Sequence, residues 1–81
     1  MRLDKYLKVS RLVKRRTLAN EAISQSRVLL NGKAVKPAAE VKAGDKIELH
    51  FGTRVIQVEV IDTSDRTSKV DASQMYRVIS E

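Results

Sequence analysis

The spacing of apolar residues changes from a helical to an extended period near Ser26, and this change restricts the chain to a mixed α+β fold. Over residues 3–7, apolar side chains recur at i, i+3 and i+4, which is the stripe of one short helix. Over residues 47–51, apolar and polar residues alternate, as in a half-buried strand. With 81 residues, the chain is long enough for one small domain, in which both patterns share a core.

The helical part divides into two helices. The first stripe does not continue cleanly, so we expect a bend or short turn between Val9 and Arg16. Thr17 is a good N-cap for a second helix because its hydroxyl can accept a hydrogen bond from an unpaired backbone N–H. Leu18, Ala22 and Ile23 would then form the buried side of that helix.

Turn signals divide the remaining chain into four or five short strands. Asn31-Gly32 predicts a type I′ hairpin between residues 28–30 and 33–36. We interpret residues 62–73 as a polar loop, after which residues 75–79 could return as a strand or turn. The expected fold is α+β, with two N-terminal helices packed on a small twisted sheet. The core candidates are Leu3, Leu7, Leu18, Ala22, Ile23, Val28, Leu30, Ile47, Leu49, Val58 and Val60.

Positive charge is concentrated at the N-terminal end. The first seventeen residues hold seven Lys and Arg against one acid, and residues 1–46 hold twelve against four, a net charge of +8. Residues 47–81 hold four against six, a net charge of −2. A polarised basic surface on a folded domain favours binding to nucleic acid.

Composition argues against other functions. The chain has no Cys, only His50 as histidine, and no glycine-rich phosphate loop, so we expect no catalytic set, metal or cofactor. No apolar run exceeds three residues, so we expect no membrane partner. The chain is therefore expected to be a binding module, not an enzyme, located in the cytoplasm.

Four segments, in order, resemble the S4 RNA-binding domain: Arg2–Leu7, Lys14–Ala19, Arg27–Lys33 and Val41–Ile47. The resemblance covers residues 1–61, leaving 62–81 as a polar linker and short C-terminal segment. It implies the S4-like (alpha-L) fold, which binds structured RNA through the two N-terminal helices and the adjoining hairpin.

The opening nineteen residues, the short length and Met75-Tyr76 resemble the RqcP group, stand-alone S4 proteins of bacterial ribosome quality control. That resemblance implies binding to large ribosomal subunits that carry peptidyl-tRNA, with contacts to rRNA. The protein would either stabilise the P-site tRNA or aid its movement into the P site. The resemblance also implies cooperation with an RqcH-type factor that adds alanine tails to stalled chains. We expect a ribosome-associated monomer.

Arg2 and Arg16 match the most characteristic basic positions of the S4 pattern, and each guanidinium can direct two donors at phosphate oxygens. Asp4 could pair with Lys8, Arg15 or Arg16, and we favour an ion pair that orients an arginine for RNA. The helix terminus at Thr17 could accept a phosphate. The expected RNA-binding residues are Arg2, Lys8, Arg11, Lys14, Arg15, Arg16, Thr17, Arg27 and Lys33.

Two alternatives remain open. One is a general rRNA-binding or heat-shock ribosome-rescue S4 factor, although residues 62–81 are short and slightly acidic, whereas those relatives usually carry a longer basic extension. The other is a helix-turn-helix DNA-binding regulator. The second helix would carry Asn20, Glu21 and Gln25 outward, with its cations before Thr17, which favours contacts to the backbone over base reading.

Overall fold

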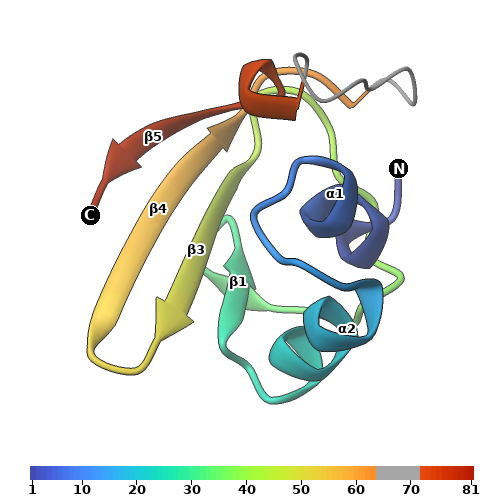
Figure 1. The fold of residues 1–81 in the computed structure, drawn as a ribbon, viewed down its shortest axis with the longest axis vertical. Coiled ribbons are helices and arrows are strands. Elements are labelled where there is room, and N and C mark those ends of the chain that lie inside the picture. The colour runs from blue at the N-terminus through green and yellow to red at the C-terminus, as the bar shows by residue number, and fades with distance from the viewer. Residues whose placement is uncertain (64–71) are drawn as a thin grey trace.

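The computed structural model describes residues 1–63 and 72–81. Helices α1 (Leu3–Val9) and α2 (Arg16–Ser24) lie together on one side of an antiparallel sheet (Figure 1). The sheet has the order β2-β1-β3-β4-β5, so the expected α+β arrangement is confirmed. Its strands are β1 (Val28–Leu30), β2 (Lys33–Ala34), β3 (Lys46–Phe51), β4 (Arg54–Val60) and β5 (Tyr76–Ser80), and a single 3-10 turn, η1 (Ala72–Gln74), precedes β5. Neither helix in this part of the chain is long and apolar enough to cross a membrane.

The core lies between the helices and the sheet and contains most of the residues predicted for it. Leu18 is the exception, because 46% of its surface is exposed. Helix α2 instead turns Ala19 and Ile23 inward, one turn apart, and the small Ala19 allows α2 to approach its neighbours closely. Ala22, also predicted to be buried, packs half-buried against the core.

The two helices are joined by a tight connection, as predicted. Arg11 has a φ of 64°, a left-handed conformation that is unusual for a residue with a side chain. The prediction that Thr17 caps α2 is wrong. Helix α2 begins at Arg16, and its N-cap is Arg15, whose backbone is extended and whose carbonyl accepts a hydrogen bond from the Ala19 N–H at 3.0 Å. Thr17 is therefore already inside the first turn.

Two further turns position the strands. Asn31 and Gly32 have φ values of 52° and 81°, which confirms the predicted type I′ hairpin between β1 and β2. The Asn31 side chain also accepts a hydrogen bond from the Lys46 N–H at 2.9 Å, joining this turn to β3. Helix α2 is followed by Ser26, which has a φ of 59°, and the Arg27 N–H donates to the Ala22 carbonyl at 2.9 Å.

The C-terminal segment closes the core. Residues 64–71 of the predicted polar loop lie outside the described residues, and residues 72–74 form η1 instead of continuing it. The predicted return over 75–79 is a strand, β5, which pairs with β4. Met75 is buried, and its carbonyl accepts hydrogen bonds from the Ile61 and Asp62 N–H groups and from the Tyr6 hydroxyl. The Tyr6 contact, at 2.6 Å, links α1 directly to the C-terminal segment.

We expect Tyr6→Phe to lower the free energy of unfolding by about 1 kcal/mol, the contribution of one buried hydrogen bond. The loss stays small because the Met75 carbonyl keeps its two backbone donors. Urea denaturation followed by circular dichroism measures it. Tyr76→Phe is the matched control, since the half-buried Tyr76 hydroxyl has no hydrogen bond to the described residues. Equal effects of the two substitutions would contradict the role assigned to Tyr6.

Candidate nucleic-acid interface

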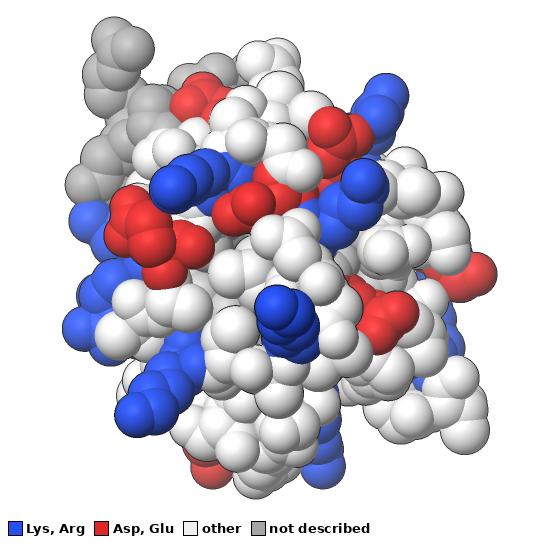
Figure 2. Space-filling model, turned by 180° about the vertical axis from the view of Figure 1, so that it is seen from behind, with Lys and Arg blue, Asp and Glu red and all other residues white. Residues whose placement is uncertain are grey.

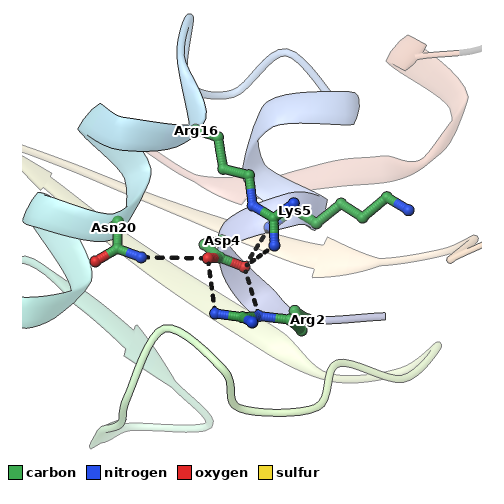
Figure 3. Close-up of polar contacts among 5 residues, drawn as sticks. All are labelled: Arg2, Asp4, Lys5, Arg16 and Asn20. Atoms are coloured by element: carbon green, nitrogen blue, oxygen red, sulfur yellow. Dashed lines mark hydrogen bonds and ion pairs between the residues drawn. The ribbon is translucent and has the colours of Figure 1, made fainter.

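A buried carboxylate joins the two helices. Asp4 on α1 is 1% exposed, and Figure 3 shows it surrounded by donors from both helices. The Arg2 guanidinium donates from Nε to Oδ1 and from Nη2 to Oδ2, each at 3.2 Å. From α2, Arg16 Nη2 lies 3.4 Å from Oδ1, and Asn20 Nδ2 donates to Oδ2 at 3.3 Å. The Lys5 N–H completes the shell at 2.7 Å from Oδ1.

These donors keep Asp4 charged despite its burial. Burial alone would raise the pKa of the carboxyl group, because a charged group loses water. The hydrogen bonds from Arg16 and the Lys5 N–H, together with the positive charges of Arg16 and Arg2, outweigh burial and bring the pKa of Asp4 below its usual value. Asp4 is therefore an anion at neutral pH, and it holds the two arginines in fixed positions.

Both arginines keep an exposed part for a ligand. The Arg2 and Arg16 side chains are 50% and 47% exposed, whereas the Asp4 side chain is 2% exposed. They line a shallow hollow together with Met1, Lys5, Glu40 and Thr63. Only part of each guanidinium is used by Asp4, so the remaining N–H groups are available to an anion such as a phosphate.

Four of the remaining candidate residues line two further hollows, and Arg15 lies at the start of α2. Thr17 is exposed and lines a second hollow with Asp4, Arg16 and Asn20. Lys8, Arg11 and Lys14 line a third one, with Val13 at its base. Arg15 is exposed at the N-cap of α2.

Arg27 and Lys33 are exposed outside these three hollows. Arg27 follows α2, and Lys33 is the first residue of β2, the strand at one edge of the sheet. No group of three or more possible metal ligands occurs in the described ranges.

Two features of the centre were not predicted from the sequence. The sequence predicts Asn20 as an outward residue of α2, yet its side chain contacts Asp4. Its spacing of i+4 from Arg16 was the available signal, since these residues share a face of the helix. The sequence also does not predict that Arg2 and Arg16 both form an ion pair with Asp4. Of the considered partners, Arg16 contacts Asp4, and Arg15 and Lys8 have no ion pair with it within residues 1–63 and 72–81.

The charged surface is not uniform around the molecule. Seen from behind, the protein carries both signs, and lysine and arginine side chains gather toward the left margin (Figure 2). Because this view is turned by 180° about the vertical axis, its left margin corresponds to the right side of Figure 1, where α1 and α2 lie. On the two strands farthest from the helices, both arginines are paired with acids: Arg77 on β5 with Glu59, and Arg54 on β4 with Glu81 at 3.3 Å.

Comparison with known proteins agrees with the fold described above. Residues 1–47, which contain both helices and the first hairpin, match the S4 domain family. The chain belongs to this family. It is 47% identical over all 81 residues to the RQC P-site tRNA stabilizing factor of Streptococcus pneumoniae, covering 92% of that protein. It is also 47% identical over its full length to the Bacillus subtilis protein of the same name, covering 94% of it.

A solved structure has the same fold. The trimeric structure of Vibrio cholerae Heat Shock Protein 15 superimposes with a TM-score of 0.87 over 96% of this chain and 80% of that chain, at 34% identity. The S4-like fold predicted from the sequence is therefore confirmed.

We expect Asp4→Asn to lower the free energy of unfolding by about 1–2 kcal/mol at pH 7, because the charged hydrogen bonds from both arginines are lost. The pKa of Asp4 is lowered by folding, so its contribution is present above the usual carboxyl value of 3.8 and disappears as pH falls through the folded value. The difference between wild type and variant should therefore shrink below pH 4. Chemical denaturation at pH 7 and pH 3 measures this, and an unchanged difference would contradict it.

Proposed function

We propose that this S4 protein binds structured RNA on the large ribosomal subunit and stabilises P-site tRNA during ribosome quality control. The observation that carries the proposal is the pair of half-exposed arginines that the buried Asp4 carboxylate fixes where α1 meets α2. Fixed guanidinium groups suit phosphates whose spacing is set by a folded RNA. The full-length relatives named RQC P-site tRNA stabilizing factor supply the ribosomal setting.

The distribution of cations favours RNA backbone contacts over base reading in a DNA groove. Arg11, Lys14 and Arg15 precede or cap α2. Exposed positions within α2 include Thr17, Asn20 and Glu21, and Asn20 is already occupied by Asp4. A recognition helix needs several side chains free to reach base edges. The helix-turn-helix alternative is therefore disfavoured.

A second candidate function follows from the structural neighbour. Heat Shock Protein 15 shares the fold, so a heat-shock or general ribosomal RNA-binding role is the main competitor. Sequence identity favours the quality-control role, at 47% against 34%. The two roles share the RNA-binding surface and differ in which large subunits are bound.

The proposed function also includes binding partners and a place in a quality-control pathway. Binding would involve large-subunit rRNA and peptidyl-tRNA in the cytoplasm, and it would support alanine tailing by an RqcH-type factor. We propose that residues 1–61 carry the RNA contacts, through Asp4-oriented Arg2 and Arg16 and the cations around them. The protein would act without catalysis and as a monomer, although the neighbouring Heat Shock Protein 15 structure is described as trimeric.

We expect Arg16→Ala to reduce affinity for large ribosomal subunits at least tenfold while the protein stays folded. Its contact with Asp4 is long and half-exposed, so the loss of stability should stay below about 1 kcal/mol. Co-sedimentation with purified large subunits measures binding. Arg54→Ala is the matched control, since Arg54 is an exposed arginine on β4, away from the helices. Unchanged co-sedimentation of Arg16→Ala would contradict the proposal.

The salt dependence of binding reports how many phosphates are contacted. If six are neutralised, log Kd should change with log salt concentration with a slope of about 4 to 5, and Arg16→Ala should reduce that slope by about 1. Binding measured on duplex DNA and structured RNA at equal salt separates the two nucleic acids. Preference for the duplex DNA would favour the regulator alternative.

The ribosomal setting is tested in cell extract. Sedimentation of the tagged protein, with the large-subunit pool probed for peptidyl-tRNA, separates the two candidate roles. Enrichment on subunits that carry peptidyl-tRNA is expected. Equal association with every RNA-containing fraction would support only a general S4 RNA-binding role.

A further inference from the structure

Two large exposed apolar side chains line one surface groove, and the sequence pattern predicts one of them, Leu18, to be buried. Leu18 on α2 and Phe51 at the end of β3 are 46% and 43% exposed, and both line this groove. Phe51 lies on the same face of β3 as the buried Leu49, since side chains alternate along a strand. The groove is lined mainly by residues of α2 and of the end of β3. Figure 1 shows these two elements and the turn from β3 into β4.

The groove combines apolar walls with positively charged sides. Leu18 and Ala22, one turn apart on α2, form one wall, and Phe51 forms the other. Lys14 enters from the connection before α2, and Arg27 enters from the segment after it. This combination matches an unpaired nucleotide, which has an apolar base with a phosphate on each side.

We propose that this groove binds an unpaired nucleobase of the RNA, stacked on the Phe51 ring. The inference rests on the proposed RNA-binding function and adds a second contact to it. Lys14 connects the two, because it also lines the hollow that contains Lys8 and Arg11. An RNA strand bound by Lys8, Arg11 and Lys14 would therefore continue into the groove along a positively charged surface. The site selects RNA with a bulge or loop at this position, because a base within a duplex cannot enter.

The charge on the groove distinguishes a base from the side chain of a partner protein. An apolar protein side chain needs no cation on either side of the groove, and Glu21 is the single acid that lines it against Lys14 and Arg27. A phosphate backbone needs such cations, and the Arg27 guanidinium can additionally lie against the base. His50 also borders the groove, and its Nε2 lies 3.0 Å from the Glu48 carboxylate.

The test compares two RNA probes: a fully paired hairpin, and the same hairpin with one unpaired adenosine. We expect Phe51→Ala to weaken binding of the bulged hairpin about 5- to 100-fold, as loss of one base–aromatic stack does, and to change binding of the paired hairpin less than twofold. Phe51→Tyr should restore binding and Phe51→Leu should not, because stacking needs a ring. Val78→Ala is the matched control, since Val78 is equally exposed on β5.

A fluorescent variant gives a second readout. The chain contains no tryptophan, so Phe51→Trp introduces a single indole, whose emission should be quenched by the bulged hairpin and not by the paired one. Circular dichroism confirms that each variant is folded. If Phe51→Ala binds both probes as wild type does, while Arg16→Ala has lost both, the base site is overturned and the proposed function stands.

Two other outcomes would also overturn the base site. If wild type binds neither hairpin nor large subunits, the proposed function fails together with it. If Phe51→Ala binds both hairpins normally but loses large subunits, the groove accommodates protein instead of a base.

Discussion

The structure depends on how a buried carboxylate is neutralised. Asp4 faces inward on α1, and an uncompensated charge at that position would be strongly destabilising. Arg2, Arg16 and Asn20 supply the compensation, and two of these residues belong to α2. The ion pairs therefore set how the two helices meet. They also reduce the freedom of the arginine side chains, so less conformational entropy is lost when a phosphate binds.

Two residues in left-handed backbone conformations follow the two helices and thereby help to place the cations. Arg11 reverses the chain after α1, and Ser26 reverses it after α2. Non-glycine residues seldom adopt this conformation, because the side chain crowds the backbone. Lys14 lies in the connection before α2 and Arg27 in the segment after it, and both line the same groove. The groove between α2 and β3 consequently has positive charge at both sides.

Much of this fold could be predicted from the sequence, because the spacing of apolar residues and the residue types at turns are local signals. The stripe at Leu3, Tyr6 and Leu7 and the Asn31-Gly32 turn needed no tertiary information. The start of α2 and the exposure of Leu18 could not be predicted in this way, since they depend on which helix face approaches the core. For the candidate site, the basic residues were identifiable by type and by resemblance. Asn20 was not, because its contact with Asp4 exists only once the two helices have packed.

Helix α1 links the stability of the core to the geometry of the candidate site. Its seven residues are too few for a stable helix in isolation, so its conformation depends on packing. Tyr6 attaches it to Met75 near the C-terminus, and the Leu3 N–H donates to the Ala39 carbonyl at 2.8 Å. Asp4 lies between these two anchors. Changes that loosen the C-terminal segment are therefore expected to disturb the positions of Arg2 and Arg16 as well. The proposed RNA contacts would then depend on residues 72–81, although these residues contribute no cation to the Asp4 centre.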